Sequence, residues 1–594
     1  MTTDEAAAGT EPGIEGFRTS PLQNRIWRTA RHARSVVVLS VSGPVPTARI
    51  EASLRAATER HEMLRTSFRT LPELAFPLQV IHDLPLAGTR LTDLSGEDPA
   101  ARAAALEALV EAHRRRTEDP APRADLVTLS GADRQLVLSL PALCADAGTL
   151  LALCREVAEG CGTPGPAPED PPQYADVTEW IHDVLDSPAG EAGRDYWATA
   201  SAGLAPALAE PAANGTGAAS TVAPTVASAH LDASDAELVD RAAAALGEST
   251  EVFLLTCWQI LRWRAAPQGV PALGVLLDGR AHAELAHVLG PLTRCVPLTG
   301  RVDLAESFAA LARRTGRALE EHREWQEHFD AAACCRSAGK PENAYFREVF
   351  GYTDARATWS AGGTTFAVEL LQAEGEPSAG RLTCLRLPGG LRAELHRAPG
   401  AGGDAAPDAT LLDRLRTLAL SAARRPEAAV GALEWLGTGE RRAIGAFSAG
   451  PALDSGGPAP EVPSKGAPGL FHERFAASAL RHADRTALVF GDERLTYREL
   501  DERADHIAHR LAAAGVRPRQ VVAVWTAPSP DLIAAVLGIL KAGCAYLPLI
   551  PGESPSRAAG ILSDSGAAAL VVDRAPPPGL PLPAAAVLRT DVPQ

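Results

Sequence analysis

Two segments rich in Ala, Pro, Gly, Ser and Thr divide this chain of 594 residues into three blocks, and they limit its fold more than any other feature. The segments span 201–228 and 446–467, and such a composition is typical of linkers. The first two blocks are long enough to bury hydrophobic cores. The sequence therefore predicts several folded units, and any site must lie within one unit or between two.

Charge and cysteine usage exclude several classes of protein. The 57 basic and 73 acidic residues give a net charge of −16, and no basic run indicates binding to nucleic acid or an anionic membrane. No apolar run approaches the ~20 residues that a membrane helix needs. The acidic N-terminus is unlike a signal peptide, so we expect a cytoplasmic protein. Nine scattered cysteines without a C-x-x-C pair predict neither disulfides nor a metal site.

The first block mixes helices with a β-hairpin. A helix begins after Ser20, which can form a capping box with Gln23, and Pro21 suits the first helical position. The hairpin leads directly into a helix, so the stretch "LSLPALCADAG" at 138–148 forms a strand-to-helix junction. The expected elements are a helix at 46–68, strands at 124–130 and 134–140, and a helix at 148–160.

The other two blocks differ in pattern. The middle block predicts an α+β unit with an apolar helix at 251–265 and a strand at 272–280. The last block alternates short apolar strands with helices, which favours a parallel α/β sheet. Thr496 and Glu499 form a capping box at the start of one of these helices.

The first two blocks contain six motifs, at 20–27, 60–68, 173–180, 195–200, 273–280 and 289–298. In this linear order they resemble those of the condensation domain of nonribosomal peptide synthetases. The resemblance implies two lobes similar to chloramphenicol acetyltransferase, which meet in a V around a tunnel. Carrier proteins would present thioesters on phosphopantetheine arms, and an acceptor amine would attack the donor thioester to form an amide. The motifs are "SPLQNRIW" (20–27), "RHEMLRTSF" (60–68), "QYADVTEW" (173–180), "DYWATA" (195–200), "LGVLLDGR" (273–280) and "LGPLTRCVPL" (289–298).

The last block resembles the beginning of an adenylation domain, through "LTYRELDERA" (495–504) and "LKAGCAYLPL" (540–549). No glycine-rich phosphate loop follows a strand there, and Ile550 replaces the aspartate usual after "PL" in the family. We expect no adenylation by this chain alone. The expected organisation is a disordered tail (1–16), a condensation N-lobe (17–200), a linker (201–228), a C-lobe (229–445), a linker (446–467) and an adenylation N-terminal fragment (468–594).

The resemblance places the family's catalytic signature, His-His-x-x-x-Asp-Gly, on residues 141–147. Pro141 and Ala142 replace both histidines, the glycine is displaced to Gly148, and Asp146 remains. The resemblance implies that Asp146 pairs with Arg280 of the second lobe. The alternative from the residues alone is that Asp146 caps the helix at 148–160. Both roles are structural.

Other candidate residues are expected to be structural. Cys144 lacks a neighbouring base, and His61 belongs to a helix that matches a structural motif. Arg25 and Arg65 are expected to make structural polar contacts, and the match around Trp325 and His328 is too loose to assign roles. The chain itself is expected to bind no cofactor or metal.

Three functions stay open. The first is a condensation enzyme impaired by Ala142, since a positioned imidazole is worth about 10²–10⁴-fold as a general base. The second is a non-catalytic domain that docks carriers or gates an assembly line. The third is one half of a split synthetase, whose adenylation domain another subunit would complete.

Overall fold

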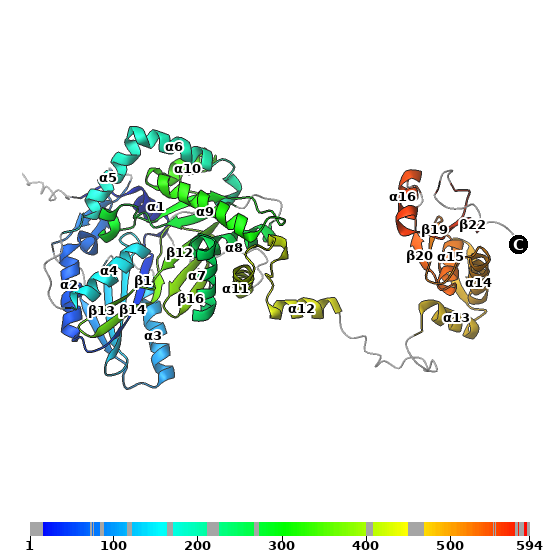
Figure 1. Ribbon diagram of the computed structural model, residues 1–594, viewed down its shortest axis with the longest axis horizontal. Helices are drawn as coiled ribbons and strands as arrows, with labels where there is room; N and C mark the ends of the chain where they lie inside the picture. Colours follow the sequence, from blue (N-terminus) through cyan, green and yellow to red (C-terminus); the bar gives the residue numbers. More distant parts are fainter. Residues whose placement is uncertain are drawn as a thin grey trace, which may run out of the picture. The chain divides into compact units, whose positions relative to one another are not determined.

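The computed structural model divides the chain into two compact units, Met1–Gly450 and Pro451–Gln594, which are described separately. In Figure 1 the first unit carries the elements from α1 to α12 and the second those from α13 onward. The structure describes residues 16–594 apart from 72–73, 75, 84–87, 116–120, 163–169, 211–224, 267–271, 399–407, 450–468, 551, 553, 577–579, 581–586 and 591–594. The expected tail 1–16, apart from Gly16, and much of both expected linkers lie outside the described residues.

The first lobe is built on a six-stranded sheet in the order β13-β14-β1-β6-β5-β4. Val37, Leu39 and Val41 of β1 face α2 and α4, whereas Val36 and Val38 face α3, so both faces of the strand are buried. The strands are β1 (Arg34–Ser42), β4 (Thr89–Asp93), β5 (Arg123–Thr128), β6 (Asp133–Pro141), β13 (Thr358–Ala361) and β14 (Thr364–Gln372), beside a hairpin of β2 (Thr66–Arg69) and β3 (Leu78–Ile81). The helices are α1 (Pro21–Ala30), α2 (Thr47–Arg60), α3 (Pro99–Arg114), α4 (Ala147–Gly160), α5 (Tyr174–Asp186) and α6 (Pro188–Ala200).

The second lobe has a six-stranded sheet in the order β10-β9-β12-β15-β16-β8. Every residue from Val252 to Leu261 of α8 is buried, because α7, α9 and α11 all pack against this helix. The strands are β8 (Thr225–Asp232), β9 (Ala272–Leu277), β10 (Arg294–Thr299), β12 (Glu348–Asp354), β15 (Gly380–Leu387) and β16 (Gly390–Arg397), with β7 (Leu208–Ala209) and β11 (Tyr345–Phe346) paired separately. The helices are α7 (Ala233–Ala245), α8 (Thr250–Ala265), α9 (Phe308–Trp325), α10 (Ala331–Ser337), α11 (Asp408–Arg424) and α12 (Thr438–Ala449).

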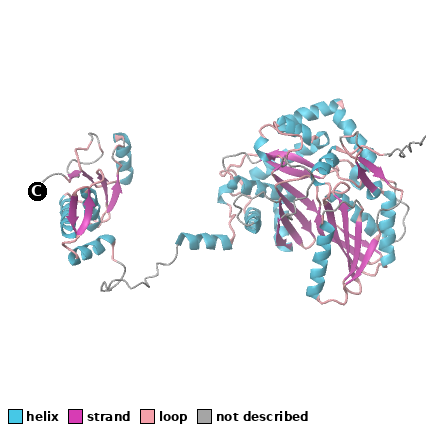
Figure 2. Ribbon diagram, turned by 180° about the vertical axis from the view of Figure 1, so that it is seen from behind, coloured by secondary structure: helices cyan, strands magenta, loops and turns pink. Residues whose placement is uncertain are grey.

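Strands β13 and β14 cross from the second half of the sequence into the first lobe. Strand β14 pairs antiparallel with β1, from Val36 opposite Gln372 to Ser42 opposite Thr365. The expected C-lobe, 229–445, therefore contributes two strands to the sheet of the other lobe. Figure 2 shows the two groups of strands side by side within this unit.

Three predicted boundaries in this unit differ from the structure. The helix expected at 46–68 ends at Arg60, because His61 adopts an extended backbone, with a short 3₁₀ turn and β2 following. The linker expected at 201–228 contains β7 and the start of β8. Strand β7 pairs with β11, and β8 pairs with β16 along its whole length. Helix α12 extends to Ala449, into the linker expected at 446–467.

The second unit confirms the predicted parallel α/β pattern. Its four strands, in the order β20-β19-β21-β22, are all parallel, and Thr496 and Glu499 form the expected capping box. The helices are α13 (Phe471–Arg481), α14 (Tyr497–Ala513), α15 (Pro530–Lys541) and α16 (Pro555–Ser565). The strands are β19 (Val521–Trp525), β20 (Ala545–Pro548), β21 (Ala569–Val572) and β22 (Val587–Arg589), with a separate hairpin of β17 (Thr486–Phe490) and β18 (Glu493–Thr496).

Candidate active site

The junction between β6 and α4 lies where the two lobes of the first unit meet. Pro141 ends β6 opposite Arg34 of β1, and the Ala142 amide donates to the Ala33 carbonyl at 2.9 Å. Helix α4 then begins at Ala147 with Asp146 as its N-cap, so the expected strand-to-helix junction is present.

Asp146 acts in both of the ways that the sequence left open. Its Oδ1 accepts hydrogen bonds from the Thr149 amide and hydroxyl, both at 2.8 Å, which caps α4. Arg280 of the second lobe donates to the same carboxylate at 2.9 and 3.0 Å. The amides of Leu292 and Thr293 add bonds of 2.8 and 2.9 Å, and the Thr293 hydroxyl adds one of 3.0 Å.

This bonding fixes the charge of the buried carboxyl. Burial by itself raises the pKa of a carboxylic acid, but the charge of Arg280 and the donors of Thr149 outweigh it and hold the pKa of Asp146 at about 2. Asp146 is therefore ionised at neutral pH and has no free oxygen with which to take a proton. Gly148 leaves room for this arrangement, because a side chain there would collide with the Arg280 guanidinium.

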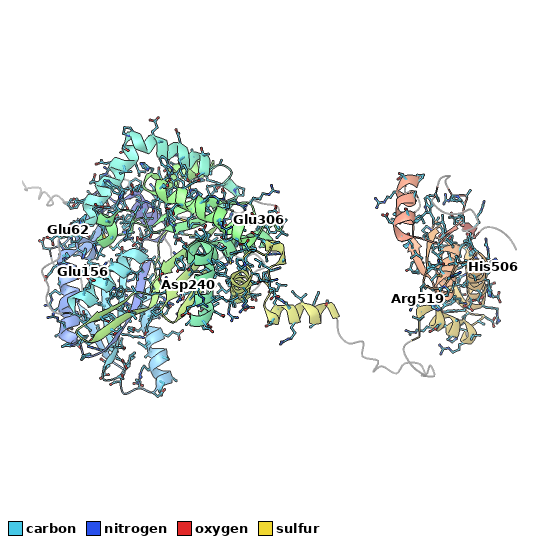
Figure 3. All side chains as sticks on the ribbon, in the orientation of Figure 1. Glu62, Glu156, Asp240, Glu306, His506 and Arg519 are labelled. Atoms are coloured by element: carbon cyan, nitrogen blue, oxygen red, sulfur yellow. The ribbon has the colours of Figure 1, made fainter. Side chains whose placement is uncertain are left out.

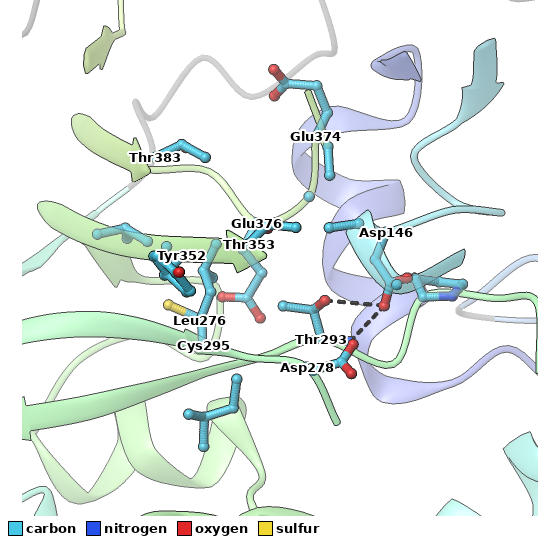
Figure 4. Close-up of a pocket in the computed structure, with 18 of the residues that line it drawn as sticks. Asp146, Leu276, Asp278, Thr293, Cys295, Tyr352, Thr353, Glu374, Glu376 and Thr383 are labelled. Atoms are coloured by element: carbon cyan, nitrogen blue, oxygen red, sulfur yellow. Dashed lines mark hydrogen bonds between the residues drawn. The ribbon is translucent and has the colours of Figure 1, made fainter. Parts of the chain in front are cut away.

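A cavity of about 260 Å³ lies beside this network. Figure 4 shows Asp146, Thr293 and Asp278 at one end of it and Tyr352 of β12 further along. The polar lining residues are Asp146, Asp278, Thr293, Cys295, Tyr352, Thr353, Asp354, Glu374, Glu376, Arg381 and Thr383. Pro141 and Ala142 are not among the lining residues.

A second cavity, of about 560 Å³, adjoins the first between α1, α5 and α10. Arg25 of α1 donates to both carboxylate oxygens of Glu376 at 2.9 and 3.2 Å, and the pair is largely buried. Both cavities share Leu22, Thr293, Cys295 and Glu376 in their linings, so these residues lie between them.

Ala142 is enclosed in an apolar cluster. It is 1% exposed and packs in one cluster with Leu22 and Ile26 of α1, Ala33 and Leu143. Neither Ala142 nor Pro141 has a titratable side chain, so the two positions on which the family resemblance places the histidines offer no group to accept a proton.

Comparison with protein families identifies this arrangement. The model for the condensation domain matches residues 17–329, and the model for AMP-binding enzymes matches residues 475–592. The chain belongs to the condensation domain family. Part of an AMP-binding (adenylation) region follows the condensation domain, and the structure has the two lobes and the parallel sheet that the sequence predicted.

Curated relatives are much longer than this chain. Chondramide synthase from Chondromyces crocatus is 28% identical over 94% of this chain and 14% of its own length. Phosphinothricin tripeptide synthetase PhsC from Streptomyces viridochromogenes is 28% identical over 96% of this chain and 54% of its own length. The chain thus spans between a seventh and about half of these two relatives.

Two solved structures share the fold. The first condensation domain of the calcium-dependent antibiotic synthetase, in complex with a substrate analogue, is 20% identical with a TM-score of 0.61. It covers 71% of this chain and 99% of that chain. The nonribosomal peptide synthetase FmoA3 is 22% identical with a TM-score of 0.62, over 98% of this chain and 64% of its own.

The other candidate side chains of the condensation domain are held in structural contacts. Cys144 is buried, and desolvation raises the pKa of its thiol to about 12, so it carries no thiolate at neutral pH. His61 lies 2.6 Å from Glu156, which Figure 3 labels on the first lobe. Arg65 donates to the His82 carbonyl at 2.6 Å. Trp325 and His328 do not line either of the two cavities.

A Ser-His-Asp chain of hydrogen bonds in the first lobe has no local signature in the sequence. His113 lies 2.9 Å from the Ser139 hydroxyl and 2.8 Å from the Asp125 carboxylate. All three side chains are buried, and none lines either of the two cavities, so substrate cannot reach the serine. Burial lowers the pKa of His113 despite the Asp125 charge. The chain of hydrogen bonds ties α3 to β5 and β6.

The described residues contain neither a metal-binding cluster nor a membrane-spanning helix. Within the described ranges no group of three or more His, Cys, Asp or Glu side chains could hold a metal ion. In the same part of the chain, no helix has the length and apolar character needed to cross a membrane. All nine cysteines are free and buried.

Proposed function

We propose that this condensation domain forms amide bonds between carrier-bound substrates in secondary-metabolite biosynthesis, at a rate lowered by the loss of its histidine. Phosphopantetheine arms of partner carrier proteins would bring the donor thioester and the acceptor amine. The names of the relatives, among them a tripeptide synthetase, support this class of reaction.

The observation that carries the lowered rate is the environment of Ala142. An amine held as an ammonium cannot attack a thioester, and an imidazole that takes its proton is worth about 10²–10⁴-fold. Ala142 is aliphatic and enclosed by Leu22 and Ile26. Asp146 cannot substitute for the imidazole, because its oxygens are occupied and its pKa is about 2.

The remaining architecture supports catalysis by positioning. Asp146 and Arg280 hold the lobes together beside two adjoining cavities. Bringing two tethered reactants together gives effective molarities of about 10⁵–10⁸ M in well-oriented systems. A domain without the histidine therefore keeps a large part of what a condensation domain supplies.

One observation favours the second candidate, a non-catalytic docking or gating domain. The ion pair of Arg25 and Glu376 and the side chain of Leu22 lie where the two cavities adjoin. If these side chains block the connection between the two cavities, a substrate in one cavity would never reach a substrate in the other, and the domain would only bind carriers.

A single-turnover assay separates the two functions. Donor and acceptor carriers, each loaded with its thioester, are mixed with the protein, and acyl transfer is followed by intact-protein mass spectrometry. Transfer above the protein-free background supports the enzyme, whereas carrier binding without transfer supports the docking domain.

The variant that restores the histidine needs a companion change. An imidazole at position 142 would enter space filled by Leu22 and Ile26, and overpacking of this kind costs about 1–3 kcal/mol. We therefore expect Leu22→Ala/Ala142→His to transfer faster than the native protein, and Ala142→His alone to gain less. The matched control is Leu22→Ala.

A further inference from the structure

The carboxylates that line the first cavity differ in what holds them. Five carboxylates and only one guanidinium, that of Arg381, are found among its lining side chains. Such a wall attracts a cationic amine. Most of these carboxylates are already committed to arginines, so the partners of each decide which of them can act on a substrate.

Arginine donates to all five carboxylates, and Asp278 shares its partner, Arg280, with Asp146. Asp146 is bound by Arg280, Asp354 by Arg356 at 2.9 and 3.1 Å, Glu374 by Arg381 at 2.8 Å, and Glu376 by Arg25 at 2.9 and 3.2 Å. A carboxylate in such a pair is a poor proton acceptor, because the neighbouring cation favours its ionised form.

Asp278 is bound at one oxygen only. Its Oδ1 accepts a hydrogen bond of 2.8 Å from Arg280 Nη1, the same nitrogen that donates to Asp146 at 3.0 Å. Its Oδ2 accepts no hydrogen bond from any residue that the structure describes, and the side chain is 62% exposed. Asp278 follows directly after β9, and its Oδ1 lies close to Gly148 at the start of α4.

From this geometry we propose that Asp278 is the proton acceptor for the acceptor amine, in place of the missing imidazole. The proposal rests on the proposed condensation function. The free Oδ2 receives the ammonium of an amine substrate in the cavity, while Arg280 holds Oδ1 in place.

The reaction balances without a further reactant. Asp278 takes one proton from the ammonium, and the nitrogen lone pair forms the C–N bond at the thioester carbonyl. The C–S bond then breaks, and the sulfur leaves as a thiol with the second proton lost by nitrogen. Asp278 releases its own proton to water, so ammonium and thioester become amide, thiol and one proton.

The environment of Asp278 suits a base better than that of its neighbours. Desolvation at the cavity wall raises the pKa of Asp278, Arg280 opposes this shift and the negative charge of Asp146 adds to it, although 62% of the side chain is exposed to water. A carboxylate with a raised pKa is a stronger proton acceptor. The pKa of Asp146, on the same arginine, is lowered instead.

Two acceptors of equal shape test the role directly. β-Alanyl-pantetheine carries an alkylammonium, whereas aminooxyacetyl-pantetheine has oxygen in place of one methylene and a nitrogen that is unprotonated at neutral pH. With an acyl-pantetheine donor, we expect Asp278→Asn to lower the single-turnover rate for the β-alanyl acceptor by about 10²–10⁴-fold. The rate for the aminooxy acceptor should change less than threefold, and Asp278→Glu should recover part of the loss.

The controls separate this inference from the proposed function. Glu159→Gln removes an exposed carboxylate that pairs with Arg155 on α4 and lines neither cavity, so both rates should stay near those of the native protein. If the native protein acylates neither acceptor, both the condensation function and the role of Asp278 are refuted. If native protein acylates both and Asp278→Asn matches it, or loses both equally, only the role of Asp278 is overturned.

Discussion

Breaking the ion pair between Asp146 and Arg280 should loosen the junction of the two lobes more than any surface change. We consider Arg280→Met, which keeps much of the volume of the side chain and removes its charge. The side chains of Arg280 and Asp146 are 5% and 6% exposed, so neither partner is screened by water. Arg280 also donates to the Thr149 hydroxyl and the Gly290 carbonyl, both at 3.0 Å.

The size of the effect follows from two estimates. Lowering the pKa of Asp146 from 3.8 to about 2 corresponds to about 2 kcal/mol of net stabilisation of its ionised form. Removing one partner of a buried pair costs about 3–5 kcal/mol, because the other charge stays buried without compensation. We expect Arg280→Met to fall in this second range at pH 7. The double variant Asp146→Asn/Arg280→Met should lose less than the sum of the single variants.

The acid dependence gives a second magnitude. The folded pKa of Asp146 lies below the unfolded value, so its stabilising contribution is present above about pH 4. It is lost as the pH falls through about 2. In Arg280→Met the folded pKa should rise, and this part of the acid sensitivity should disappear.

Hydrogen exchange followed by mass spectrometry is the assay, combined with urea unfolding of the first unit. The amides of Thr149, Leu292 and Thr293 donate to Asp146 and should exchange faster in Arg280→Met. Arg155→Ala is the control, because its exposed pair with Glu159 on α4 is worth about 0.5 kcal/mol or less. Unchanged exchange at these amides, with a stability loss below 1 kcal/mol, would refute the reasoning.

Three further predictions concern buried groups. The Nδ1 of His322 lies 2.6 Å from the Tyr196 hydroxyl, and burial lowers the pKa of His322 to about 4. Unfolding titrations should therefore show about 3 kcal/mol of stability lost as the pH falls from 6.5 to 4, and His322→Asn should abolish that loss. Phe366→Ala should lower the free energy of unfolding in urea by about 3–5 kcal/mol, because the ring on β14 is fully buried between β1 and β13. A loss under 1 kcal/mol would contradict the pairing of β14 with the sheet of the first lobe. Cys144 should resist iodoacetamide in the native protein and react only after unfolding, and rapid native labelling would show that it is accessible.

Local signals in the sequence were sufficient for much of the fold. The capping box of Ser20 and Gln23 forms as predicted, with Pro21 at the first helical position. The hairpin of β5 and β6 and the parallel sheet of the second unit also follow the predicted pattern. These features depend on neighbours within a few residues, which a single sequence shows directly.

The pairing of strands from distant parts of the sequence could not be predicted from these local signals. Strand β14 alternates like any half-buried strand, and nothing in its residues says which lobe it joins. The helix predicted at 46–68 ends at Arg60, where His61 adopts an extended backbone and contacts Glu156, almost a hundred positions away. The sequence pattern predicts Asp278 as part of the strand at 272–280. Which of its oxygens lacks a partner depends on Arg280, which also donates to Asp146 of the other lobe.

The surroundings of Ala142 show how a small side chain is packed at this junction. An alanine in place of a large polar side chain would leave a cavity that costs stability, unless neighbouring groups fill it. Here Leu22 and Ile26 pack against Ala142, and Leu22 also lines both adjoining cavities. The space that an imidazole at position 142 would need is therefore filled by side chains of α1. Leu22 packs against Ala142 and lines both cavities, so shortening its side chain changes the packing around position 142 and the connection between the cavities together. Leu22→Ala is therefore the necessary control for any variant that places a histidine at position 142.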